Sequence, residues 1–206
     1  MPKKIVLLPG VGIHKDKVIY HEFLSQVILG LYRRGIECTG EICIWENGHD
    51  DEIIPLMPYE KIRRLFCSVL LDFMVSVKDG NSMPIPEADF YIGHSAGSII
   101  ALTRGKPCVI FGSPASLVNL IYDETIKAKW CSFMLRKGGS EVLNIINEYD
   151  PIAYPLHDLF CENYTFKPSW WRFLSKEPFT SHVSYWTSKE VIDVTVSRLA
   201  KWAKLA

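Results

Sequence analysis

The sequence lacks an excess of charge of either sign. Lysine and arginine number 23, as do aspartate and glutamate, so the formal net charge is zero. Binding to nucleic acid or to an anionic membrane rests on clustered positive charge, and this balance gives no reason to expect either. The apolar run at residues 5–8 is far too short for a signal-peptide core or a membrane span. We therefore expect a cytoplasmic protein with no nucleic-acid partner and no stable membrane insertion.

Several motifs for cofactors and crosslinks are also missing. The six cysteines are scattered without a C-x-x-C pair, which favours reduced structural thiols, with a disulfide in a secreted form as the alternative. The acidic segment 46–52 has no metal-ligand spacing, and the glycines after residue 9 do not form G-x-G-x-x-G. We expect no metal ion and no organic cofactor.

No repeat, low-complexity run or linker interrupts the 206 residues, so the sequence predicts one domain over residues 1–206. Apolar patterns predict strands at 4–8, 41–45, 88–92, 108–111, 142–146 and 164–166. Helical spacing predicts helices at 17–34, 59–77, 98–102 and 189–204. This alternation predicts an α/β fold, with a mostly parallel central sheet and helices on both faces in three layers.

The most informative segment is residues 93–97, which read Gly-His-Ser-Ala-Gly. A G-x-S-x-G sequence between a strand and a helix is typical of a nucleophile elbow, a tight turn that holds the serine in strained backbone geometry with its Oγ exposed. Without a Cβ at Gly93 and Gly97, the helix can pack close to the neighbouring strands. We therefore expect Ser95 to be a catalytic nucleophile.

A serine nucleophile needs a base to take its proton and an acid to orient that base. His182 lies just ahead of the last predicted helix, in a loop expected at the carboxyl ends of the strands, so we expect it to be the base. Asp150 follows the predicted strand 142–146 and precedes a proline that ends the ladder, so we expect it to be the acid. His157 is the alternative base. The alternative acids are Asp158, Glu148 and Asp123.

Two backbone N–H groups are needed to stabilise the oxyanion of a tetrahedral intermediate. We expect one from Ala96, directly after the nucleophile, and the other from Val11 in the glycine loop after the first strand, with Gly12 as the next choice. We also assign five residues to substrate binding. These are Gly10, Gly12, His94, Trp170 and Trp171.

The order of glycine loop, elbow serine, acid after a strand and histidine before the last helix resembles the α/β-hydrolase superfamily over nearly the whole chain. The segment Leu-Leu-Pro-Gly-Val-Gly at residues 7–12 resembles its oxyanion loop, although many members have histidine where this chain has Pro9. The resemblance is to compact members of the serine esterase and lipase type. It implies hydrolysis of small to medium apolar carboxylic esters through an acyl-enzyme. The alternatives are a thioesterase or amidase with the same triad, and a catalytically silent binding module with this fold.

Overall fold

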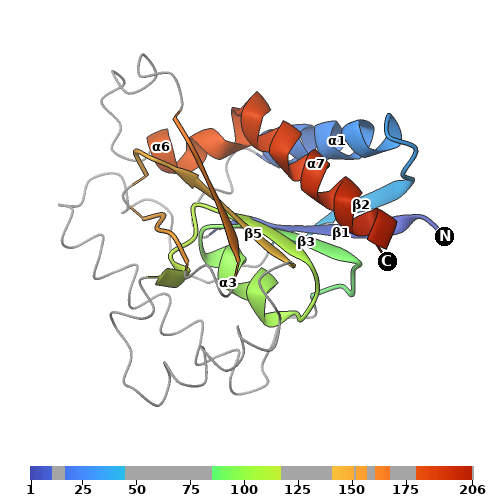
Figure 1. The fold of residues 1–206 in the computed structure, drawn as a ribbon, viewed down its shortest axis with the longest axis horizontal. Helices are drawn as coiled ribbons and strands as arrows, with labels where there is room; N and C mark the ends of the chain where they lie inside the picture. Colours follow the sequence, from blue (N-terminus) through green and yellow to red (C-terminus); the bar gives the residue numbers. More distant parts are fainter. Residues whose placement is uncertain are drawn as a thin grey trace.

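A computed structural model describes residues 1–10, 17–44, 85–116, 141–150, 152–156, 161–167 and 180–205. The strands are β1 (Lys3–Leu8), β2 (Cys38–Ile42), β3 (Phe90–His94), β4 (Cys108–Phe111), β5 (Val142–Asn147) and β6 (Glu162–Phe166). The helices are α1 (Lys17–Tyr32), α3 (Ala96–Thr103), α6 (Thr180–Val183), α7 (Lys189–Leu205) and the 3-10 helix η4 (Ser184–Thr187). The elements of this part of the chain follow the order β1, α1, β2, β3, α3, β4, β5, β6, α6, η4, α7 (Figure 1).

The described strands form one all-parallel sheet in the order β2-β1-β3-β4-β5-β6. From β1 the chain first adds β2 on one side and then builds β3 to β6 on the other, so the order of strands reverses between β1 and β3. Leu8 and Gly93 are partners in the register of these two strands, so their carboxyl ends lie at the same level. In parallel sheets this reversal point is where functional groups collect.

Side chains alternate between the two faces of the sheet, as the period of a strand requires. Ile5 and Leu7 lie in a core under α1 and α7, whereas Val6 and Leu8 lie in a second core with the residues of α3. Figure 1 shows α1 and α7 on one side of the sheet and α3 on the other. The three-layer α/β architecture expected from the sequence is confirmed.

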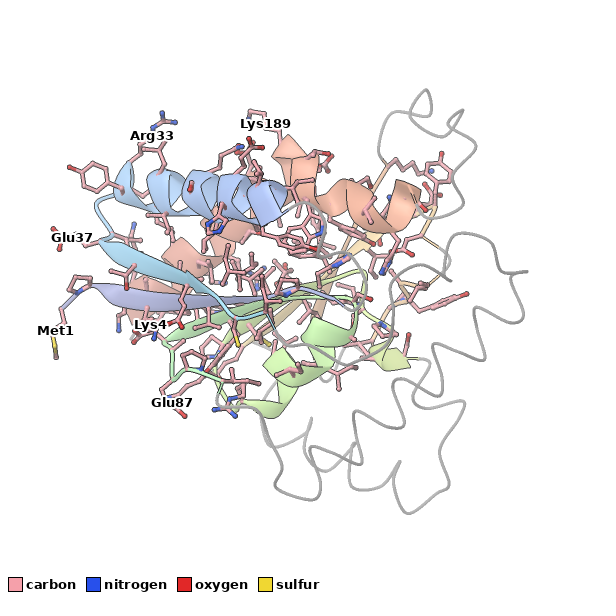
Figure 2. All side chains as sticks on the ribbon, turned by 180° about the vertical axis from the view of Figure 1, so that it is seen from behind. Met1, Lys4, Arg33, Glu37, Glu87 and Lys189 are labelled. Carbon is pink, nitrogen blue, oxygen red and sulfur yellow. The ribbon has the colours of Figure 1, made fainter. Side chains whose placement is uncertain are left out.

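Small residues allow the layers to approach closely. A Cβ on Gly30 of α1 would lie 2.7 Å from a methyl group of Val196 in α7, and one on Gly40 of β2 would lie 2.7 Å from the Ile28 methyl of α1. Polar side chains such as Arg33 and Lys189 point away from the sheet (Figure 2). Among the helices of the described ranges, none combines the length and apolar character that crossing a membrane requires.

Two elements differ from the sequence-based expectation. The second strand is Cys38–Ile42 and not 41–45, because its position is set by pairing with β1 from Cys38 onward and its side chains are largely exposed. Residues 180–187, expected as a loop, form α6 and η4, which bury Tyr185 and Trp186. The expected helix at 59–77 lies outside the described residues.

Candidate active site

Ser95 sits at the turn between β3 and α3 in an unusual backbone conformation. Its φ is 52° and its ψ is −129°, and within the described ranges it alone among non-glycine residues has a positive φ. Such a conformation costs about 1–3 kcal/mol and persists only where surrounding structure enforces it. The α-helix begins at the very next residue, Ala96. The strained turn expected from the sequence motif is therefore present, but Ser95 is only 2% exposed, which differs from the exposed Oγ that the motif predicts.

The glycines on either side of Ser95 are required by close contacts. A Cβ on Gly93 would lie 2.6 Å from the Cα of Ser98, which belongs to α3. A Cβ on Gly97 would overlap the carbonyl oxygens of Leu8 and Pro9 at the end of β1. Because these neighbours are backbone atoms, they have little freedom to move aside. The expected steric role of both glycines is confirmed.

A chain of hydroxyl groups holds the carbonyl of Ser95. Ser98 Oγ donates to the Ser95 carbonyl oxygen at 2.5 Å and lies 2.7 Å from Ser113 Oγ, which in turn accepts the N–H of Ala115 at 3.2 Å. Because Ser98 uses its proton on the carbonyl, Ser113 must donate to Ser98. Both serine side chains are buried. The backbone of the elbow is thus tied to the segment that follows β4.

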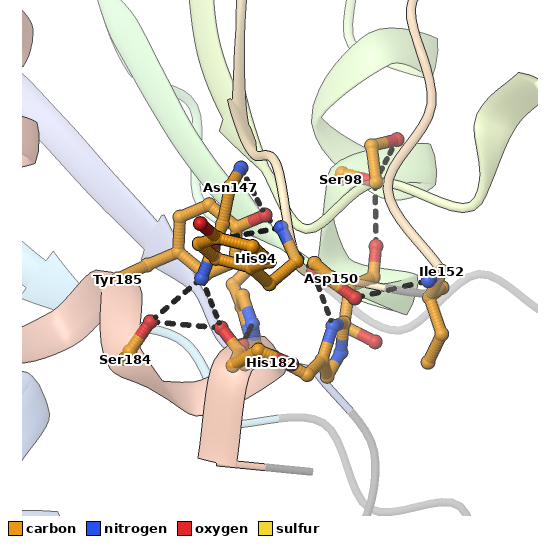
Figure 3. Close-up of polar contacts among 12 residues, drawn as sticks. His94, Ser98, Asn147, Asp150, Ile152, His182, Ser184 and Tyr185 are labelled. Carbon is orange, nitrogen blue, oxygen red and sulfur yellow. Dashed lines mark hydrogen bonds and ion pairs between the residues drawn. The ribbon is translucent and has the colours of Figure 1, made fainter. Parts of the chain in front are cut away.

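Asp150 and His182 form a buried pair. The Nδ1–H of His182 donates to Asp150 Oδ2 at 2.9 Å, and the two residues are only 3% and 5% exposed (Figure 3). Asp150 Oδ1 accepts the N–H of Ile152 at 3.0 Å. Because a carboxylate can only accept, the proton of the His182 ring is on Nδ1 in the neutral form, and Nε2 is its basic nitrogen.

Asp150 is ionised despite its burial. Burial alone would raise its pKa, but attraction to His182 and hydrogen bonds from His182, Ile152 and Tyr185 outweigh burial, so the pKa lies below its usual value. A buried carboxylate without such donors would take up a proton. These donors keep the Asp150 carboxylate negatively charged next to the His182 ring.

His94, next to Ser95, is completely buried and donates a hydrogen bond to the backbone of His182. Its Nε2–H donates to the carbonyl of His182 at 2.8 Å, and the two ring centroids are 4.6 Å apart. Burial and the nearby His182 ring lower the pKa of His94 to about 3, so it is neutral at physiological pH. Its assignment to substrate binding stays a prediction, and the contacts that are present are structural.

Two glycines lie close to Ser95 and to the rings of His94 and His182. A Cβ on Gly10 would lie 3.1 Å from Ser95 Oγ and 3.4 Å from His94 Nδ1. A Cβ on Gly112, whose φ is +58°, would lie 3.0 Å from His182 Cε1 and 3.1 Å from His94 Nε2. Ser95 and His182 therefore both lie near the buried ring of His94, at the carboxyl ends of β1, β3 and β4.

Two further residues of the site were not expected from the sequence. Tyr185 Oη donates to Asp150 Oδ2 at 2.9 Å. The amide of Asn147, at the end of β5, donates to the Ser181 carbonyl at 2.9 Å and to Ser184 Oγ at 3.0 Å, which ties the His182 segment to the sheet. The available signal was an asparagine inside an apolar strand pattern, because a buried amide needs partners.

Of the other candidates predicted from the sequence, the structure describes Glu148 and Ala96. Glu148, an alternative acid, pairs with Lys167 at 2.9 Å, and both side chains are substantially exposed. Ala96 is the first residue of α3, where helix N–H groups lack intrahelical partners. The remaining candidates lie outside the described residues and are Val11, Gly12, Asp123, His157, Asp158, Trp170 and Trp171. Within the described ranges, no three His, Cys, Asp or Glu residues are grouped as metal ligands would be.

Comparison with known proteins gives no assignment. No protein-family model matches the chain, and no curated protein sequence matches it. Function has to be inferred from the residues of the site and their geometry.

Proposed function

We propose that this protein is a serine hydrolase of the α/β-hydrolase type that cleaves small to medium apolar carboxylic esters. The observation that carries the proposal is the strained Ser95 at a strand-to-helix turn. Ser95 lies near the buried His94 ring, as does His182 of the hydrogen-bonded Asp150–His182 pair. Strained backbone at a serine is characteristic of nucleophile elbows. A buried carboxylate–imidazole pair is the arrangement that activates such a serine.

In the proposed reaction, Ser95 Oγ attacks the carbonyl carbon of the ester while its proton passes to Nε2 of His182. The Nδ1–H bond to Asp150 fixes the required tautomer and stabilises the imidazolium that forms. Collapse of the tetrahedral intermediate breaks the bond to the alcohol, which takes the proton from Nε2. Water then attacks the acyl-enzyme by the same route, releasing the carboxylic acid and restoring Ser95.

Charge on the substrate oxygen has to be stabilised during both steps. The N–H of Ala96 is suited to this, because it directly follows the nucleophile and lies at the start of α3, where the helix dipole favours negative charge. We propose the N–H of Val11 as the second donor. Gly10, which precedes it, has no side chain to block the approach to Ser95 Oγ.

A fluorophosphonate probe followed by peptide mapping tests the proposal, because it labels activated serines covalently. We expect labelling at Ser95, and we expect Ser95→Ala to abolish both labelling and hydrolysis of p-nitrophenyl butyrate. Ser25→Ala is the matched control, since Ser25 is exposed on α1 and should label like the wild type.

Each alternative gives a different result. Labelled protein that hydrolyses thioesters or amides faster than esters would keep the nucleophile and change the substrate class. Folded protein that is not labelled would refute the hydrolase proposal and favour a binding module that retains the fold. Labelling at a different serine would show that the elbow is not the reacting group.

A further inference from the structure

The Tyr185 side chain is tightly packed beside Asp150. Its ring is completely buried, stacks on Phe111 with centroids 5.4 Å apart, and meets Phe166 edge-on at 5.6 Å. Packing against aromatic rings on two strands leaves the side chain no freedom to turn. Its hydroxyl group is therefore placed by the core of the protein and not by the site itself.

The hydroxyl of Tyr185 accepts hydrogen bonds from the backbone N–H groups of Asn147 and Gly112 and lies beside Asp150, and the directions of these bonds follow from chemistry. The N–H of Asn147, which can only donate, reaches Tyr185 Oη at 2.9 Å. Tyr185 Oη is 2.9 Å from Asp150 Oδ2, and an ionised carboxylate can only accept (Figure 3). The phenol proton therefore points at Asp150. Burial and the adjacent Asp150 raise the pKa of Tyr185, so the phenol keeps this proton throughout the physiological range.

Asp150 Oδ2 is shared between two donors, because it also accepts the Nδ1–H of His182 at 2.9 Å. We propose that Tyr185 is a positioning residue that fixes the Asp150 carboxylate and, by sharing its charge, tunes how readily His182 takes up a proton. This inference rests on the proposed function for its role in catalysis, whereas the coupling itself exists in the resting protein.

The sign of the effect follows from electrostatics. A donor on Oδ2 withdraws part of the negative charge that would otherwise stabilise protonated His182. Without the Tyr185 donor, His182 should hold a proton up to a higher pH. The titratable groups that face His182 within the described ranges are Asp150 from the segment after β5, His94 from β3 and, through Asp150, Tyr185 from η4.

Tyr185→Phe tests the proposal, because it removes the hydroxyl and retains the ring. Tyr91→Phe is the matched control. Tyr91, on β3, is equally buried, and its hydroxyl donates to the Pro86 carbonyl at 2.9 Å. Two readouts are needed. One is the pH profile of kcat/KM with p-nitrophenyl butyrate. The other is NMR titration of the His182 ring in the Ser95→Ala background, with its signal assigned by loss in His182→Ala.

For Tyr185→Phe we expect the titration midpoint of His182 and the rising limb of the kcat/KM profile to move to higher pH by about half a unit to one unit. We also expect kcat to fall about tenfold with little change in KM, because Asp150 is no longer fixed in the position that orients the His182 ring. Tyr91→Phe should leave both midpoints unchanged.

An unchanged His182 midpoint in folded Tyr185→Phe would overturn the proposal and leave Tyr185 as a packing residue. A shifted midpoint in a protein that hydrolyses no ester would support the coupling and refute the proposed function. If Tyr185→Phe does not fold, replacement of Tyr185 by 3,5-difluorotyrosine strengthens the donor. The midpoint should then move to lower pH, and no movement would refute the proposal.

Discussion

Replacement of the buried His94 by glutamine should make the protein less sensitive to acid. In the wild type, Nε2–H of His94 donates to the His182 carbonyl at 2.8 Å, and burial lowers the pKa of the ring to about 3. The glutamine amide nitrogen can take the place of Nε2 as donor, but it has no proton to gain. His94→Gln therefore removes one titrating group and retains its hydrogen bond.

The magnitude follows from linkage between protonation and folding. In the unfolded chain the ring takes up a proton below its ordinary pKa of 6.5, whereas in the folded protein it resists protonation down to about pH 3. Because the unfolded state binds more protons in this range, stability falls as the pH falls, by roughly 1.4 kcal/mol for each unit below 6.5. Between pH 7 and pH 5, His94 should therefore lower the free energy of unfolding by about 2 kcal/mol.

Urea unfolding at pH 7 and at pH 5 measures this difference. We expect the wild type to lose about 2 kcal/mol more than His94→Gln between the two pH values. His21→Gln, at an exposed position on α1, should behave like the wild type. Comparing losses within each protein cancels any fixed cost of the substitution. An equal loss in the wild type and His94→Gln would refute the claim that His94 stays neutral when buried.

Two further substitutions test how the site is held. Gly97→Ala places a Cβ against the Leu8 and Pro9 carbonyl oxygens and should destabilise the fold by about 2–3 kcal/mol, measured as a lower Tm. The control is Gly35→Asn, which lies in open space at a φ of +76° and should lower the Tm far less. Asn147→Ala frees the His182 segment and should lower kcat about tenfold. Asn163→Ala, which removes amide bonds to Leu156, should lower stability but not kcat, and equal loss of kcat in both would contradict this role.

The sequence was sufficient to predict those features that local pattern determines. The glycines around Ser95 have no substitute at a turn this tight, so the motif predicted both the turn and its strain. The alternation of strands and helices predicted the parallel sheet, and the carboxyl ends of parallel strands meet at one edge. That rule led to Asp150 and His182 as partners, and their side chains lie within hydrogen-bonding distance.

The features that were missed depend on contacts between distant segments. Tyr185 lies in a segment that was expected as a loop, and only the fold brings its hydroxyl to Asp150, 35 residues away in the sequence. The position of β2 was misjudged because an exposed edge strand has little apolar pattern, and pairing with β1 decides where it begins. The helical turns at 180–187 form because burial of Tyr185 and Trp186 outweighs weak local preference.

The hydroxyl chain behind the elbow has a single arrangement of protons. Most pairs of hydroxyl groups can exchange donor and acceptor roles, but this chain begins at the Ala115 N–H and ends at the Ser95 carbonyl, so neither end can reverse. The Ser98 and Ser113 hydroxyls thus have no rotational freedom left to lose. Under the proposed function, the backbone of Ser95 is therefore ordered in the resting protein, and ligand binding need not supply free energy to organise it.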